Sequence, residues 1–282
     1  MEVIRHPDAM SAWARRQRGE RGLVALVPTM GALHEGHLSL IRLAREQAEQ
    51  VVVSLFVNPV QFGEGEDFAI YPRCEEVDRV LCEQEGVTVL FMPDAKDVYA
   101  EDASVWVDEE QLSRGLCGAS RPGHFRGVCT VVLKLFNWVQ PDVAIFGEKD
   151  AQQVRIIERM VRDLNVPVEV VRGPTVREAD GLAMSSRNRR LSGLQRSVAP
   201  GLYQALQMVE RSVRDGEREV GVLVDEVRGA LEELEGVVID YVVLVDDVSL
   251  VEIERVDGPA LLAVAVWMGE VRLIDHCVLG AG

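Results

Sequence analysis

Two histidines and two glycines stand close together in residues 28–37, which read PTMGALHEGH. This segment follows an apolar run at 23–27 and precedes a stretch with helical periodicity, so it lies where a strand gives way to a helix. In α/β proteins such junctions bind ligands, and a helix N-terminus attracts phosphate. His34 and His37 share one helix face, and Gly36 between them lets a phosphate approach the backbone. The pattern therefore predicts phosphate chemistry.

Metal ligation is the main alternative for this histidine pair. A zinc protease would carry H-E-x-x-H, with the two histidines four residues apart, whereas this chain has H-E-G-H. No third group of ligands accompanies His34 and His37 in the sequence. Contact with phosphate is therefore favoured over a metal pair or a pair of surface histidines.

Polar residues also follow two further apolar runs. Residues 58–62 (NPVQF) follow one run, and residues 147–153 (GEKDAQQ) follow another. Because the carboxyl ends of parallel strands meet at one edge of a sheet, both segments are expected near the histidine motif. The amide of Gln61 can bind a carboxylate or hydroxyl without adding charge, and Lys149 suits phosphate oxygens. A simple strand-closing loop and a capped helix are the respective alternatives.

Asp150 and Gln153 extend the second of these segments. Asp150 either caps the helix that begins here or assists a magnesium ion. Gln153 lies about one helical turn further on and is expected to face the same crevice.

Two later loops are rich in arginine. In residues 177–188, Ser185 and Ser186 stand beside Arg187, a group that can clamp a triphosphate or departing pyrophosphate. A polar interdomain loop is the alternative, but clefts at domain boundaries bind ligands, which favours the functional reading. The glycine-rich loop at 118–127 is either a mobile cover over anions or a helix entry with solvated arginines. The chain contains neither G-x-x-x-x-G-K-[ST] nor G-x-S-x-G, which excludes a P-loop and the usual serine-hydrolase elbow.

The elements that must position these residues alternate between strand and helix up to about residue 175. Amphipathic segments separate short runs rich in Val and Ile, and residues 128–139 indicate a buried helix. This order predicts an α/β fold with a doubly wound parallel sheet. Strands are expected at 23–27, 51–57, 87–92, 105–107, 143–146 and 166–171.

The pattern changes after residue 175. Charged residues are dense between 202 and 234, which indicates two solvated helices, and the apolar stretches that follow favour a small antiparallel sheet. With a turn at Gly173-Pro174 as the hinge, we expect a ligand-binding domain at 1–175 and a smaller α+β domain at 176–282. The expected strands of the smaller domain are 237–245, 259–267 and 271–274.

Composition narrows the class of protein. The formal net charge of -16 argues against a nucleic-acid-binding surface, and it requires a local cluster of positive groups for any anionic ligand. Five cysteines without a C-x-x-C pair argue against a disulfide framework and fit a reducing cytosol. We expect no signal peptide and no membrane partner, because the N-terminus lacks an apolar core and the apolar runs fall short of about 20 residues.

The combined motifs are far more specific than any one of them. Together they closely resemble the pantothenate synthetase (pantoate–β-alanine ligase) family, in order and with similar spacing from the N-terminus through Ile274. The resemblance implies a Rossmann-like N-terminal domain related to H-x-G-H nucleotidyltransferases, a smaller C-terminal domain that closes over ATP, and a cytoplasmic homodimer. The motifs that carry it are residues 28–37, 53–62, 71–73, 121–128, 146–153 and 184–188.

The same resemblance implies roles for individual residues. His37 would be the catalytic proton donor, with His34 and Lys149 beside it in the catalytic set. Gln61 would contact both pantoate and β-alanine, and Gln153 would hold pantoate. Magnesium would be held mainly by the phosphates of ATP. The residues expected to contact ATP are Met30, Gly31, Ala32, Leu33, His34, Glu35, Gly36, His37, Gly147, Glu148, Lys149, Asp150, Val176, Met184, Ser185, Ser186 and Arg187.

The implied reaction condenses pantoate with β-alanine at the expense of ATP, through a pantoyl adenylate. Such chemistry requires positioning and charge stabilisation, and no protein nucleophile. Two alternatives stay open on the sequence. A nucleotidyltransferase of the same superfamily would stop at a nucleotidyl product and need no amine, and a non-catalytic sensor would bind ATP without turning it over.

Overall fold

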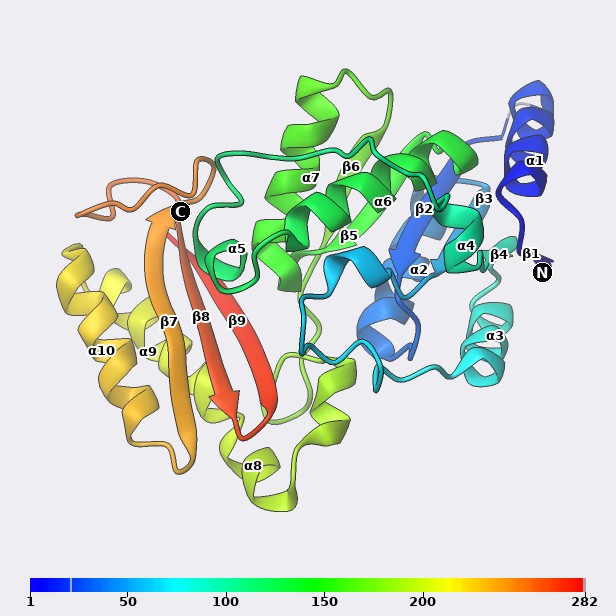
Figure 1. Cartoon of the computed structure of the whole chain (residues 1–282). Helices are drawn as coiled ribbons and strands as arrows, with labels where there is room; N and C mark the ends of the chain where they lie inside the picture. The colour runs from blue at the N-terminus through cyan, green and yellow to red at the C-terminus, as the bar shows by residue number, and fades with distance from the viewer. Residues whose placement is uncertain (21, 281–282) are drawn as a thin grey trace. The chain divides into compact units, whose positions relative to one another are not determined.

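The computed structural model describes residues 1–20 and 22–280, and these form two compact units. The first unit comprises Met1–Glu148 and Gln153–Pro174, and the second comprises Lys149–Gln152 and Thr175–Gly282. Figure 1 shows the elements of both in the colour order of the chain. The domain boundary expected between residues 175 and 176 stays a prediction.

In the described part of the first unit, parallel strands form a six-stranded sheet in the order β1-β4-β3-β2-β5-β6. From β2 the chain adds strands first on one side and then on the other, so the strand order reverses between β2 and β5. The prediction of a doubly wound parallel sheet is confirmed. The bounds are β1 Glu2–Ile4, β2 Val24–Thr29, β3 Gln50–Leu55, β4 Val89–Phe91, β5 Val143–Gly147 and β6 Glu169–Gly173.

Helices on this sheet bury its central strands. Leu26, Val52 and Ile145 are fully buried, which explains why the strands read as continuous apolar runs. The buried helix expected at 128–139 is present as part of α6. The helical bounds are α1 Pro7–Glu20, α2 Glu35–Gln47, η1 Pro59–Gln61, α3 Glu75–Gln84, α4 Ala95–Val98, α5 Leu116–Ser120, α6 His124–Val139, η2 Glu148–Asp150 and α7 Ala151–Asp163.

The strand expected at 105–107 is wrong, because the structure describes residues 103–109 as irregular chain. Val105 is 84% exposed, and the ring of Trp106 stacks on that of Tyr99 with centroids 5.9 Å apart. The N–H of Val107 donates to Oγ1 of Thr130 at 3.0 Å, so a side chain on α6 takes the place of a neighbouring strand.

The second unit contains an antiparallel sheet in the order β7-β8-β9, as predicted. Its strands are β7 Val237–Asp246, β8 Ala260–Met268 and β9 Val271–Leu279. The two helices expected between 202 and 234 are α9 Gly201–Arg214 and α10 Val220–Glu232, and Figure 1 shows them side by side along this sheet. Each has a solvated face and a face buried in the core of the unit. The remaining helices are η3 Ser186–Arg190 and α8 Gly193–Val198.

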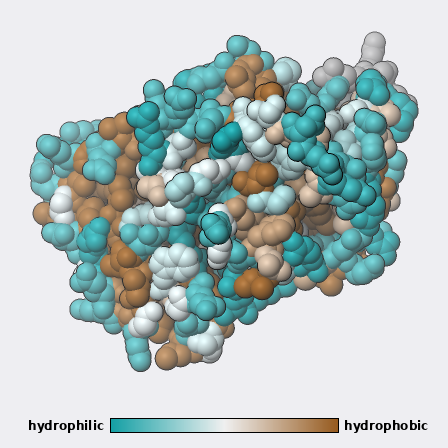
Figure 2. All heavy atoms as spheres, viewed as in Figure 1, coloured by the Kyte–Doolittle hydropathy of each residue, from teal (hydrophilic) through white to brown (hydrophobic). Residues whose placement is uncertain are grey.

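The surface is mixed in character. On the face drawn in Figure 2, hydrophilic residues are widespread and hydrophobic residues gather in separate patches.

None of the helices in the described residues is long and apolar enough to cross a membrane.

Candidate active site

Both histidines of the H-x-G-H motif stand at the first turn of α2, shortly after β2 ends. His34 is the N-cap residue, and its Nδ1 accepts the backbone N–H of Gly36 at 3.2 Å. Nδ1 of His37 accepts the backbone N–H of His34 at 3.3 Å, which completes a reciprocal capping box. The two ring centroids are 4.1 Å apart.

This capping arrangement assigns the tautomers of the two histidines. Because Nδ1 accepts a hydrogen bond in each ring, the neutral form of each ring carries its proton on Nε2. The helix start at which the rings stand is the positive end of the helix dipole. The arrangement therefore provides two side-chain N–H donors where an anion is already favoured.

The turn between β2 and α2 is held by the carboxylate of Asp78, a residue that the sequence analysis missed. Its Oδ2 accepts the backbone N–H of Ala32 and its Oδ1 accepts that of Leu33, each at 2.8 Å. Since these N–H groups are engaged by the protein itself, we expect ATP to contact Ala32 and Leu33 through other atoms. Nothing in the sequence distinguishes Asp78 from an ordinary acidic residue in the first turn of a helix.

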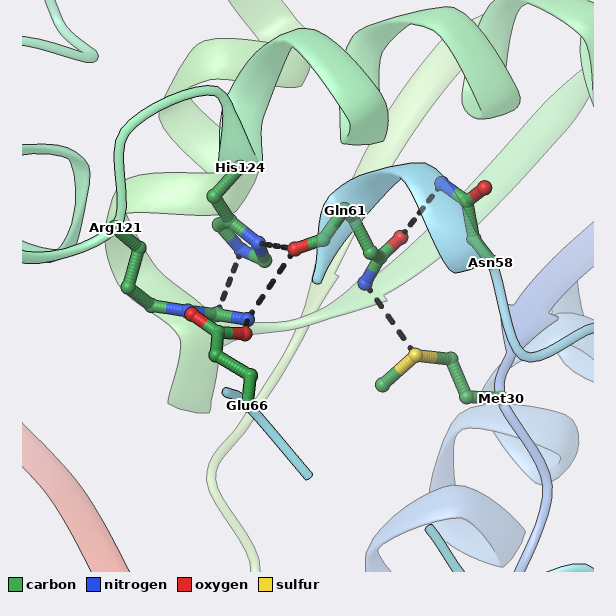
Figure 3. Close-up of polar contacts among 6 residues, drawn as sticks. All are labelled: Met30, Asn58, Gln61, Glu66, Arg121 and His124. Atoms are coloured by element: carbon green, nitrogen blue, oxygen red, sulfur yellow. Dashed lines mark hydrogen bonds and ion pairs between the residues drawn. The ribbon is translucent and has the colours of Figure 1, made fainter. Parts of the chain in front are cut away.

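Gln61 is buried at the end of η1, and Figure 3 shows its amide between two partners. Its Oε1 accepts from Nδ2 of Asn58 at 3.0 Å, and its Nε2 donates to the Met30 sulfur at 3.3 Å. Asn58 is held in turn by the Tyr99 hydroxyl, which donates to Oδ1 at 2.9 Å. The orientation of the Gln61 amide is therefore specified by its neighbours.

A second network holds the backbone carbonyl of Gln61 (Figure 3). Nδ1 of His124 donates to this oxygen at 2.8 Å and Nη2 of Arg121 donates at 3.3 Å, while Nε2 of His124 accepts from Arg121 Nη1 at 3.0 Å. Arg121 also forms a two-point ion pair with Glu66, with Nη2 2.5 Å from Oε2. Burial raises the pKa of Glu66, but the hydrogen bond and charge of Arg121 outweigh this effect and leave the pKa below its usual value.

In the glycine-rich loop at 118–127, α6 begins at His124, and Arg121 is paired with Glu66 rather than solvated. Gly127 explains how closely α6 approaches η1. A Cβ at this position would lie 2.7 Å from Cα of Gln61 and 2.7 Å from the carbonyl oxygen of Val60. A side chain at residue 127 would therefore displace the Gln61 backbone.

Glu148 follows the end of β5 at Gly147, and its carboxylate lies against arginines. Oε1 is 2.9 Å from Nη1 of the buried Arg155 and 3.4 Å from Nη1 of Arg172. Because the side chain is committed to these ion pairs, we expect ATP to contact Glu148 through its backbone. Gln153, on α7, is half-buried.

Lys149 and Asp150 belong to the second unit by their contacts. Nζ of Lys149 is 3.3 Å from Oδ1 of Asp150. In the same unit, Val176 and Met184 are brought together, because the N–H of Met184 donates to the Val176 carbonyl at 3.0 Å. The expected ATP contacts at residues 176 and 184 therefore share one piece of folded chain.

The serine–arginine segment is a structured turn. Ser185 caps η3 by accepting the N–H of Arg187 at 3.3 Å. Asn188 donates through Nδ2 to Oε1 of Glu178 at 2.9 Å and to the Ala183 carbonyl at 3.0 Å. These bonds fix the backbone of the turn that carries Ser185 and Arg187.

A buried ion pair anchors the strand-like segment before this turn. Nη1 of Arg177 is 2.6 Å from Oδ2 of Asp275 and Nη2 is 2.9 Å from Oδ1, in bidentate geometry. The guanidinium also stacks on Tyr203, with Cζ 3.8 Å from the ring centroid. Asp275 has no distinctive pattern in the sequence, because its partner lies 98 residues away.

Within the residues that the structure describes, no group of three or more His, Cys, Asp or Glu is arranged to hold a metal ion. A doubly wound parallel sheet with a histidine-capped helix at the point where its strand order reverses defines a Rossmann-like α/β protein, in which this position is the usual ligand site. Comparison with known proteins identifies the family.

The family model for pantoate–β-alanine ligase matches residues 2–278. The pantothenate synthetase of Thermotoga petrophila is 50% identical over 280 residues, covering 99% of this chain and 100% of that protein. The crystal structure of pantothenate synthetase from Thermus thermophilus aligns with a TM-score of 0.93 at 44% identity, over 98% of this chain and 99% of that one. The pantoate–β-alanine ligase of Francisella tularensis, crystallised with β-γ ATP and β-alanine, aligns with a TM-score of 0.82 at 31% identity, over 100% and 99% of the two chains.

The chain belongs to the pantoate–β-alanine ligase family. It is a ligase of pantothenate biosynthesis, and its activity is the joining of pantoate to β-alanine.

Proposed function

We propose that the ligation proceeds through pantoyl adenylate. In the first half-reaction a pantoate carboxylate oxygen bonds to the α-phosphorus of ATP. The bond from this phosphorus to the oxygen that bridges the α- and β-phosphates breaks, and pyrophosphate leaves. In the second, the neutral amine of β-alanine bonds to the acyl carbon, the bond from that carbon to the AMP oxygen breaks, and the nitrogen loses one proton to the solvent. The observation that carries this proposal is the pair of Nε2–H donors that His34 and His37 present at the start of α2.

These donors suit the charge that develops on the phosphate oxygens in the first step. A preorganised N–H group stabilises a transition state without reorganising, and removing one such group costs about 3–4 kcal/mol. In this proposal His37, which the family resemblance names as the proton donor, and His34 each donate a hydrogen bond through Nε2–H to the phosphate oxygens, and Lys149 adds a positive charge. Met30–His37 and Gly147–Asp150 contact ATP around these groups.

Gln61 suits the binding of pantoate and β-alanine. Its Nε2–H donates to the sulfur of Met30. Because a thioether is a weak acceptor, a carboxylate or hydroxyl oxygen of a substrate would be the stronger partner for this donor. Gln153 on α7 is the proposed second amide on pantoate.

In the second unit, Val176 and Met184 are proposed to contact the adenosine part of ATP, and Ser185, Ser186 and Arg187 its phosphates. The capped turn at η3 supports this assignment, because it holds the Ser185 hydroxyl against the backbone N–H of Arg187. The guanidinium would bind the leaving pyrophosphate through paired hydrogen bonds.

We propose that Mg²⁺ enters with ATP. Mg²⁺ keeps several waters and is commonly coordinated mainly by substrate phosphate oxygens. When bound, it would offset phosphate charge. Asp150 is the carboxylate that could assist it, and its approach to Lys149 at 3.3 Å leaves it in a polar environment.

We further propose that the protein is a cytoplasmic homodimer, as the family resemblance implies. Its five cysteines are free thiols, which suits a reducing compartment. Light scattering after gel filtration would report twice the 31.2 kDa of the chain for a dimer, and a mass equal to that of the chain would contradict the dimer.

An isotope experiment tests the adenylate directly. Pantoate labelled with ¹⁸O in both carboxylate oxygens is incubated with ATP, Mg²⁺ and β-alanine, and the products are analysed by mass spectrometry. One label in the phosphate of AMP and one in pantothenate would support the adenylate. Label in inorganic phosphate would indicate an acyl phosphate and contradict it.

A further inference from the structure

A buried carboxylate lies against the turn that leads into the two histidines, and the proposed reaction does not use it. Asp78 is 2% exposed, and its two oxygens accept the N–H groups of Ala32 and Leu33 at 2.8 Å. Burial of a carboxylate is unfavourable unless hydrogen bonds compensate for lost water. The hydrogen bonds of Asp78 are directed at one short piece of backbone.

That piece of backbone has an unusual conformation. Gly31 has φ +85° and Ala32 has φ +52°, in the left-handed region that residues with a Cβ rarely adopt. A Cβ on Gly31 would lie 3.0 Å from Oδ2 of Asp78, so the carboxylate packs closely against the turn. Such a conformation persists where surrounding contacts over-determine it, and Asp78 supplies two of those contacts.

The turn sets the geometry of the catalytic helix start. Leu33 directly precedes His34, whose φ of -143° and N-cap position begin α2. In the capping box, Nδ1 of His34 and Nδ1 of His37 each accept a backbone N–H of this same helix start, so a change in the turn changes both rings.

We propose that Asp78 is a positioning residue for the adenylation step: by holding residues 31–33 it fixes the start of α2, and with it the Nε2–H donors of His34 and His37. The inference rests on the proposed role of these two donors at the phosphates of ATP.

The variant Asp78→Asn tests the inference. The amide keeps the size of the side chain but places an NH₂ group against one backbone N–H. We expect kcat for pantoate-dependent pyrophosphate exchange to fall about 100-fold, as misplacement of reacting groups does, with a smaller change in KM for ATP. Glu76→Gln is the matched control, because Glu76 is an exposed carboxylate on the same helix, and its exchange rate should equal that of the wild type.

Histidine ¹⁵N spectra provide a readout that a loss of stability alone does not change. The chain has five histidines. His34 and His37 should show the Nε2–H tautomer, whereas His124, which donates through Nδ1, should show the other. In folded Asp78→Asn we expect the signals of His34 and His37 to shift and that of His124 to stay.

A second substitution tests whether the turn transmits the effect. Glycine adopts positive φ without strain, so Ala32→Gly in the Asp78→Asn background should restore exchange about tenfold. Absence of this rescue would overturn the inference, as would a folded Asp78→Asn with wild-type exchange or with unshifted His34 and His37 signals.

If Asp78→Asn does not fold, Gly31→Ala takes its place, because it strains the same turn and leaves the carboxylate intact. A folded Gly31→Ala with wild-type signals for His34 and His37 would overturn the inference. Absence of exchange in the wild type would instead contradict the proposed adenylation, whereas the histidine spectra still decide whether Asp78 positions the rings.

Discussion

Nδ2 of Asn58 donates to Oε1 of Gln61 at 3.0 Å, and this bond determines that the Nε2–H of Gln61 faces Met30. The same Nδ2 donates to the Gly127 carbonyl at 3.1 Å, while Oδ1 accepts from Tyr99. One buried amide thus connects the start of α6 to the side chain proposed to bind pantoate.

Replacing the donor end of Asn58 should disturb the binding of pantoate. Asn58→Asp places an oxygen against two acceptors, Oε1 of Gln61 and the Gly127 carbonyl, so we expect the Gln61 amide to rotate. An unsatisfied buried contact of this kind costs about 1–3 kcal/mol, which predicts about a 10–100-fold rise in KM for pantoate. Steady-state kinetics would measure it. Tyr99→Phe, which keeps the Asn58 amide, should have a smaller effect, and an unchanged KM in Asn58→Asp would contradict the assignment.

Lys149→Ala should reduce kcat for adenylation about 100–1000-fold, because it removes a positive charge proposed to stabilise the transition state. Pyrophosphate exchange at saturating ATP and pantoate would measure the loss. Lys96→Ala removes a lysine from an exposed position on α4 and serves as the matched control. Equal exchange rates in the two variants would exclude a catalytic role for Lys149.

The Arg177–Asp275 pair should matter for the stability of the second unit. Removing one partner leaves a buried charge uncompensated, so we expect Arg177→Ala to lower the free energy of unfolding by about 3–5 kcal/mol. Arg255→Ala, in an exposed pair with Asp257, should cost about 0–1 kcal/mol. Urea titrations would measure the free energy of unfolding of the two variants. Similar decreases would contradict a larger contribution of the buried Arg177–Asp275 pair to stability.

The ion pair between Glu66 and Arg121 predicts a pH dependence. The folded-state pKa of Glu66 lies below the ordinary value of 4.5. Its ionised form therefore contributes stability in full above that value, and the contribution is lost as the pH falls through the folded-state pKa. The gap in unfolding free energy between the wild type and Glu66→Gln should be constant near neutral pH and narrow under acid conditions. A gap that widens as the pH falls would contradict this sign.

Much of the fold was predictable from local patterns. The buried strands of a doubly wound sheet are continuous apolar runs, and the strands β2, β3 and β5 showed this clearly. The strand expected at 105–107 failed because a short run rich in valine does not reveal whether a neighbouring strand is present. Here Thr130 on α6 satisfies the backbone instead.

The site was predictable to the extent that its residues are consecutive in the sequence. His34, His37 and Lys149 follow strand ends, and that position alone suggests a ligand. Asp78 and Asp275 were not predictable, because each acts on backbone or side chains far away in the chain and neither has a distinctive local pattern. Contacts of this kind arise only when the whole chain folds.

The central claim is that the enzyme activates pantoate as an adenylate. The most direct measurement is the exchange of labelled pyrophosphate into ATP, with Mg²⁺ and pantoate present and β-alanine absent. We expect exchange that requires pantoate. When β-alanine is added, we expect net formation of AMP and pantothenate in place of exchange. Pantothenate formation without any exchange when β-alanine is absent would contradict the account.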